Sequence, residues 1–177
     1  MTVRSEWPIR GKMPDGLMMT AGTEADIALD IRPEGEQPLH LVPRICCLGV
    51  GCRRGTTATA LEHFLRRMLL DTGVSEKAIA AVASIDIKEG EAGLRQFCES
   101  HGWPLQVYSA YELEQVEGSF SGSDFVTRVT GVDNVCERSA VRAAEGGELI
   151  RKKLSGDGIT MALAVKEFAP DWTWQEE

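Results

Sequence analysis

The residues best suited to chemistry in this 177-residue chain follow a short apolar segment, Ile45–Val50. They are Gly51, Cys52, Arg53, Arg54, Gly55 and Thr56. Glycines permit a tight turn and a close approach of a ligand to the backbone. The start of a helix adds unpaired N–H groups and a positive dipole end. Two guanidinium groups beside it suit forked contacts with carboxylate or phosphate. The segment therefore predicts an anion site at a strand-to-helix turn.

The same glycines and arginines also fit a tight turn with two solvated side chains, and the residues alone favour neither interpretation. The spacing is not that of a dinucleotide fingerprint, because the last glycine, Gly55, falls one position late. It is not a phosphate-binding P-loop either, because no lysine precedes Thr56. A nucleotide-binding regulatory domain is therefore the weakest of the functional hypotheses.

A second polar segment, Ser84–Lys88, follows the next apolar run. Asp86 and Lys88 are expected to face the same cleft as the arginines. Glu89 and Glu91 come directly after them and equally suit the first turn of a helix, where carboxylates oppose the helix dipole. Both interpretations of the glutamates stay open.

The third segment, Thr130–Glu137, contains Thr130, Gly131, Asn134, Cys136 and Glu137. Asn134 and Glu137 have the spacing of a helix N-cap and its partner three residues later, which favours a structural role for Glu137. A helix dipole favours the thiolate of Cys136 in the first turn. No histidine lies on a neighbouring segment to activate that thiol, so a catalytic Cys–His pair is disfavoured.

Composition limits the classes of function. The net charge is −8, which argues against a general nucleic-acid binder but allows an anionic small molecule in a locally basic cleft. No apolar run approaches the ~18 residues that cross a bilayer, and the N-terminus lacks a signal core. Five cysteines, without any Cys-x-x-Cys pair, predict reduced thiols in the cytoplasm. Neither cysteines nor histidines have metal-ligand spacing, so no protein-ligated metal or cofactor is expected.

The elements that must position these residues alternate between strands and helices. Strands are expected at 45–50, 78–84 and 104–108, helices at 57–70, 91–100 and 134–144, and a hairpin over 148–167. A short helix should begin at Ser109, which has capping-box spacing to Glu112. This order predicts a three-layer α/β/α sandwich with a mixed, mostly parallel sheet of about five strands and a C-terminal β-hairpin. Ligands bind such sheets beyond the carboxyl ends of the strands.

The chain divides by composition into three parts. Residues 1–44 are proline-rich and contain one segment, Ile27–Ile31, apolar enough for a strand, so they are expected to form an arm or the remnant of a preceding region. Residues 45–168 carry the regular pattern. Residues 169–177 form a polar tail.

Taken together, the three polar segments resemble a known family. The Gly-x-Gly-Cys-Arg-Arg-Gly-Thr run at 49–56, the segment 83–94 and the segment 130–140 match the C-terminal domain of the cobalamin-biosynthesis protein CbiG, a domain shared with CobE. The resemblance covers about residues 41–168. Residues 1–44 then correspond to the linker region that precedes this domain in CbiG, so the chain resembles a truncated or split CbiG.

The resemblance implies a role in vitamin B12 synthesis. CbiG is the cobalt-precorrin-5A hydrolase, which opens a δ-lactone of a corrin precursor and releases acetaldehyde. Here the activity would reside in this domain or would require a missing N-terminal domain as partner. The alternative is a non-catalytic, CobE-like binder or carrier of precorrin intermediates. Cobalt belongs to the substrate in either case. Candidate water-activating residues are Asp86, Glu91 and Glu137. The implied substrate-binding residues are Gly51, Cys52, Arg53, Arg54, Gly55, Thr56, Ser84, Lys88, Thr130, Gly131, Asn134 and Cys136.

Overall fold

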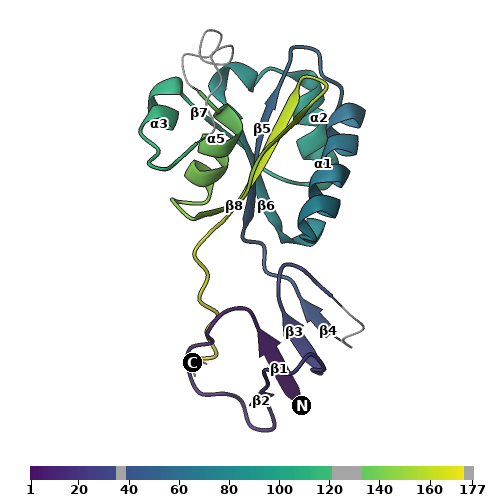
Figure 1. The fold of residues 1–177 in the computed structure, drawn as a ribbon, viewed down its shortest axis with the longest axis vertical. Coiled ribbons are helices and arrows are strands. Elements are labelled where there is room, and N and C mark those ends of the chain that lie inside the picture. Colours follow the sequence, from purple (N-terminus) through teal and green to yellow (C-terminus); the bar gives the residue numbers. More distant parts are fainter. Residues whose placement is uncertain (35–38, 121–132, 174–177) are drawn as a thin grey trace. The chain divides into compact units, whose positions relative to one another are not determined.

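The computed structural model describes residues 1–34, 39–120 and 133–173 (Figure 1). Its contacts divide the chain into two compact units. The small-sheet unit comprises Met1–Arg44, Gly73–Ala78 and Phe168–Glu177, and the five-strand unit comprises Ile45–Thr72 and Ile79–Glu167. Each unit is described by itself.

The five-strand unit is built on one mixed sheet with the strand order β7-β6-β5-β9-β8. Its strands are β5 (Cys46–Cys52), β6 (Ile79–Ile85), β7 (Leu105–Tyr108), β8 (Glu148–Gly156) and β9 (Ile159–Val165). β5, β6 and β7 are parallel, whereas β9 is antiparallel to both β5 and β8. The predicted α/β class, five-strand mixed sheet and C-terminal hairpin are confirmed.

Helices cover both faces of this sheet, with α1 and α2 on one side and α3 and α5 on the other (Figure 1). They are α1 (Ala58–Thr72), α2 (Ala92–His101), α3 (Ala110–Glu114) and α5 (Val135–Ala143), with short 3₁₀ turns η1 (Glu76–Ala78) and η2 (Asp86–Lys88). The predicted capping box of Ser109 and Glu112 is present at the start of α3. α1 buries Leu61, Phe64, Leu65 and Met68, whose spacing of three and four residues predicted the helix.

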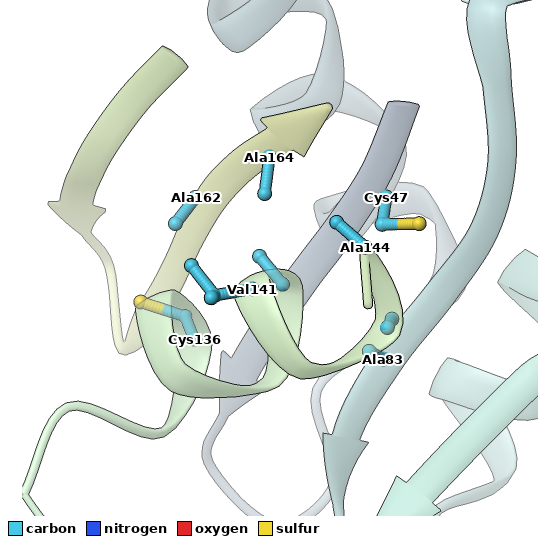
Figure 2. Packing of buried hydrophobic residues seen from close by; sticks show 9 residues of the cluster. Cys47, Ala83, Cys136, Val141, Ala144, Ala162 and Ala164 are labelled. Carbon is cyan, nitrogen blue, oxygen red and sulfur yellow. The ribbon is translucent and has the colours of Figure 1, made fainter. Parts of the chain in front are cut away.

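α5 packs against the sheet at short range because the residues between them are small. A Cβ added to Gly49 of β5 would lie 1.8 Å from the carbonyl oxygen of Cys136. Around this contact, cysteines and alanines from α5, β5, β6 and β9 form a fully buried cluster (Figure 2). Cys46 and Cys47 are completely buried, as predicted for core packing. The close packing fixes the start of α5 near the carboxyl end of β5.

The small-sheet unit differs from the expectation for residues 1–44. Besides β3 (Ile27–Leu29), which was predicted, it contains β1 (Thr2–Ser5), β2 (Met18–Met19) and β4 (Leu39–Leu41) in the parallel order β2-β1-β3-β4. Expecting only one strand was wrong, because strands of two to four residues are too short to show a period-two pattern.

Two further stretches of chain complete the small-sheet unit. Ser75 donates its backbone N–H to the Ile31 carbonyl at 2.8 Å, and Val74 beside it is buried. The rings of Trp7 and Phe168 meet edge to face at 5.0 Å. No helix within the described ranges has both the length and the apolar character needed to cross a membrane.

Candidate functional site

The predicted polar segments lie where β5 and β6 end and the helices α1, α2 and α5 begin. Two groups of residues can be distinguished. The turn group comprises Gly51–Thr56 with Asp86, Lys88 and Glu91, and the α5 group comprises Asn134, Cys136 and Glu137. Each is built by a different set of contacts.

The turn between β5 and α1 is held by its own backbone and by the hairpin of β8 and β9. Gly55 has a positive φ of 76°, a conformation that glycine adopts without strain. The Thr56 hydroxyl donates to the Arg53 carbonyl at 2.8 Å, and the Arg53 N–H donates to the Gly158 carbonyl at 3.0 Å. The side chains of Arg53 and Arg54 are exposed. The turn is therefore rigid while its two cations face solvent.

Glu91 joins this turn to η2. Its Oε2 accepts the Gly55 N–H at 3.1 Å, and its Oε1 lies 3.4 Å from Lys88 Nζ. The Gly55 N–H, Lys88 and Arg54 together lower the pKa of Glu91 below its ordinary 4.5, with the hydrogen bond from Gly55 contributing most. Glu91 is consequently a carboxylate at neutral pH, with both oxygens engaged.

α2 begins directly against the turn. A Cβ on Gly93 would lie 1.9 Å from the Thr56 carbonyl oxygen, so only glycine permits this approach. The half-buried thiol of Cys52 lies among Thr56, Lys88 and Glu91. Burial raises the pKa of Cys52, and the Lys88 ammonium only partly offsets that effect. Cys52 is therefore a thiol at neutral pH.

Asp86 and Ser84 occupy contrasting positions on the same segment. Asp86 is exposed, and its Oδ1 accepts the Ile87 N–H at 2.7 Å. Ser84 is completely buried, and its hydroxyl donates to the Val50 carbonyl at 2.7 Å. Ser84 thus ties β6 to β5, whereas Asp86 is accessible to water.

The start of α5 is capped by Asn134, as predicted. Its Oδ1 accepts the Glu137 N–H at 3.2 Å and lies 3.3 Å from Cys136 Sγ. The amide Nδ2 of Asn134 is buried and has no hydrogen-bond partner among residues 1–34, 39–120 and 133–173. The Asn134 backbone adopts a positive φ of 46°, which asparagine tolerates better than most residues.

Two expectations for α5 need correction or refinement. The helix dipole does not produce a thiolate at Cys136, because burial raises the pKa of that thiol to about 12. The carboxylate of Glu137 is completely buried and accepts the Lys153 backbone N–H of β8 at 2.7 Å. Its Oε1 therefore holds the irregular part of β8, where the register with β9 shifts.

Thr160 of β9 connects the two groups. Its hydroxyl lies 3.5 Å from the Gly51 carbonyl and hydrogen-bonds with the Cys136 side chain. Sequence reasoning missed Thr160 and Gly158, because their roles depend on the register of the hairpin against β5. Thr130 and Gly131, also predicted as binding residues, lie outside the described residues. Within the described ranges, no group of three or more His, Cys, Asp or Glu side chains could hold a metal.

This arrangement is suited to holding an anionic ligand. Arg53 and Arg54 are exposed on a rigid turn, Lys88 lies beside it, and α1, α2 and α5 all begin at the same edge. Asp86 adds an accessible carboxylate at that edge. Together these groups can bind carboxylates and can accept a proton from a bound water.

Comparison with known proteins gives consistent matches. The family model described as cobalamin synthesis G C-terminus matches residues 46–164. A cobalt-precorrin-5A hydrolase from Salmonella typhimurium is 33% identical over 162 residues, which cover 89% of this chain and 46% of the relative. Protein CobE from a Sinorhizobium species is 32% identical over 119 residues, covering 66% of this chain and 77% of the relative.

A crystal structure of CobE, described as a protein of the cobalamin biosynthetic pathway, has the same fold as the five-strand unit. It aligns with a TM-score of 0.65 and 35% identity, covering 70% of this chain and 92% of that chain. The Salmonella alignment extends beyond the range of the family model, so part of the small-sheet unit also has a counterpart there. The chain spans less than half the length of that hydrolase.

Proposed function

Because the chain belongs to the cobalamin synthesis G C-terminus family, we propose that it acts on a corrin precursor as the C-terminal half of a cobalt-precorrin-5A hydrolase. The reaction would open a lactone and release acetaldehyde. The Salmonella relative is more than twice as long as the segment it shares with this chain, and the remaining part of such a protein would contribute to the reaction.

The basic turn group is the observation that carries this proposal. Corrin precursors bear acetate and propionate side chains, and guanidinium groups bind carboxylates in a forked geometry. Arg53 and Arg54 lie on a turn whose backbone is held by Thr56 and Gly158, so the backbone that carries them need not be ordered when a ligand binds. Lys88 adds a third cation next to the turn.

Asp86 is the best placed of the three candidate bases. Opening a lactone requires a water that attacks the carbonyl and a base that takes its proton. Glu137 is fully buried and holds β8, and both oxygens of Glu91 are already engaged. Asp86 is exposed beside Lys88. In the proposed reaction, the water adds to the lactone carbonyl and its proton passes to Asp86. As the tetrahedral intermediate collapses, the ring C–O bond breaks and Asp86 returns the proton to the leaving alkoxide, which gives a carboxyl group and a hydroxyl.

The buried amide of Asn134 suits a second role in the same step. The tetrahedral oxygen that forms during attack carries negative charge, and donors placed in advance stabilise it strongly. Among the described residues, Asn134 Nδ2 at the start of α5 has no hydrogen-bond partner. Because this amide is buried, its proposed role requires that substrate binding exposes it. The cobalt is part of the substrate in this scheme and takes no ligand from the protein.

Acetaldehyde formation from cobalt-precorrin-5A tests the proposal. The chain is assayed alone and with the N-terminal half of the Salmonella hydrolase. Asp86→Asn should lower kcat by about 10²-fold or more, since general base catalysis contributes about 10²–10⁴-fold. Glu89→Gln is the matched control, because Glu89 is an exposed carboxylate three residues away. Absence of acetaldehyde with both halves present would refute the hydrolase function.

The match to CobE favours a second candidate, a non-catalytic binder of precorrin intermediates. The alignment with the CobE structure covers 92% of that chain and 70% of this one, so most of what this chain shares with CobE needs no further domain there. Titration with a cobalt corrinoid should then shift the visible absorption without turnover. Arg53→Ala/Arg54→Ala should abolish the shift, and a double variant that binds like the wild type would exclude this role for the turn.

A further inference from the structure

Glu91 places a carboxylate at the centre of the cationic turn group. It accepts the Gly55 N–H at 3.1 Å, and it lies 3.4 Å from Lys88 Nζ. Lys88 and Gly55 are donors that suit a substrate carboxylate. The carboxylate of Glu91 thus occupies the position in which a substrate carboxylate is proposed to bind.

We propose that the Gly55 N–H and the Lys88 ammonium form a carboxylate subsite whose resting occupant is Glu91, and that one carboxylate of the substrate replaces it. This inference rests on the proposed function, because it takes the ligand to be a polycarboxylate tetrapyrrole. The inference adds to the proposed function one contact with the substrate, at Gly55 and Lys88, and the displacement of Glu91 that makes this contact available.

The geometry is compatible with exchange. Glu91 and Lys88 retain side-chain exposures of 15% and 16%, so the pair is largely covered but still in contact with solvent. Their separation of 3.4 Å is longer than the 2.7–2.9 Å of a strong charge-assisted bond. An incoming carboxylate would offer the same charge and the same acceptors. The exchange therefore keeps one carboxylate on the Gly55 N–H and the Lys88 ammonium, while the Glu91 carboxylate moves into solvent.

The turn itself does not depend on Glu91. The Thr56 hydroxyl donates a hydrogen bond to the Arg53 carbonyl, and the Gly158 carbonyl accepts one from the Arg53 N–H. Gly93 packs against Thr56. These contacts remain when Glu91 swings away. The donors would accordingly stay in place for the ligand.

Glu91 then weakens ligand binding, since it must be displaced from its donors. Glu91→Gln removes the charge while keeping a side chain of the same shape. At about 1.4 kcal/mol per tenfold change in affinity, loss of one competing ion pair corresponds to an expected binding that is tighter by up to about fivefold. If Glu91 only positioned the turn, Glu91→Gln would instead weaken ligand binding.

Uroporphyrin, a tetrapyrrole with eight carboxylates, is a suitable probe, and its fluorescence reports binding to the full chain. Glu91→Gln should bind it about two- to fivefold more tightly than the wild type. Glu89→Gln removes the same charge from an exposed position two residues away and should change affinity by less than twofold. The Gly55 amide resonance should shift when uroporphyrin is added to the wild type.

Glu91→Asp provides a second variant in case the glutamine variant does not fold. Its shorter side chain keeps the charge but loses reach to Gly55, and it should bind uroporphyrin with intermediate affinity. Equal or weaker binding by Glu91→Gln, or equal tightening by Glu89→Gln, would overturn the exchange while leaving the proposed function intact. Failure of every form, including the wild type, to bind uroporphyrin would overturn the proposed ligand class and the subsite with it.

Discussion

At the scale of single residues, burial decides the chemistry of the five cysteines. Cys46, Cys47, Cys98 and Cys136 are buried, and Cys52 is half-buried. Burial raises the pKa of Cys47 to about 11 and those of Cys98 and Cys136 to about 12. The sequence could indicate that Cys136 begins a helix, but it could not indicate how deeply α5 packs, and that depth outweighs the dipole.

Alkylation should therefore select one cysteine. Iodoacetamide reacts with the thiolate, so native protein should be modified first at Cys52, with the other four protected until it unfolds. Because burial also raises the pKa of Cys52 above its ordinary 9.0, its thiolate fraction is low at pH 7 and the rate should keep rising beyond pH 9. Peptide mass spectrometry after short labelling checks this order. Early modification of Cys98 or Cys136 in native protein would contradict it.

At the scale of elements, long apolar segments were predictable and long-range contacts were not. β5, β6, β9 and the helices between them follow apolar periodicities that a single sequence displays. β1, β2 and β4 were missed, since strands of two to four residues depend on their neighbours for definition. The turn group was predicted from residue types. The bond from Gly55 to Glu91 was not, because it joins residues 36 positions apart through the packing of α2.

The contact of α5 with β5 gives a prediction about stability. Gly49→Ala would place a methyl group 1.8 Å from the Cys136 carbonyl oxygen, and such overpacking typically costs ~1–3 kcal/mol. Gly90→Ala is the matched control, because a Cβ there meets nothing within 4 Å. It should leave stability unchanged or raise it by ~0.4–1 kcal/mol through the unfolded chain. Urea unfolding monitored by circular dichroism measures both. Equal stabilities of the two variants would contradict the close packing.

At the scale of the whole molecule, the overall charge and the site charge have opposite signs. The chain carries −8, whereas the turn group combines the three cations Arg53, Arg54 and Lys88 with the two carboxylates of Asp86 and Glu91, which leaves it positive. The net charge repels a polycarboxylate at long range, and the turn group attracts it at short range. Salt screens both effects over a Debye length of about 8–10 Å.

Removing the two arginines should consequently reverse the salt dependence of binding. Salt concentrations of about 50 and about 300 mM bracket physiological ionic strength. The affinity of the wild type for uroporphyrin is expected to fall between the first and the second, because salt screens the local attraction. In Arg53→Ala/Arg54→Ala the remaining net repulsion dominates, so affinity should be lower at low salt and rise as salt is added. Fluorescence titrations at several salt concentrations measure the slopes. The same slope in both proteins would show that the turn does not attract the ligand.

The small-sheet unit bears on how this chain can be divided. Gly73–Ala78, the stretch between α1 and β6, belongs to that unit together with Met1–Arg44 and the segment after Phe168. Ser75 pairs with Ile31, and Trp7 pairs with Phe168. If the gene were divided after residue 44, the product that begins at residue 45 would therefore contain two segments of the small-sheet unit, Gly73–Ala78 and Phe168–Glu177. The two products would then either associate through these segments, or the segments would need a different sequence for each product to be stable as a separate protein.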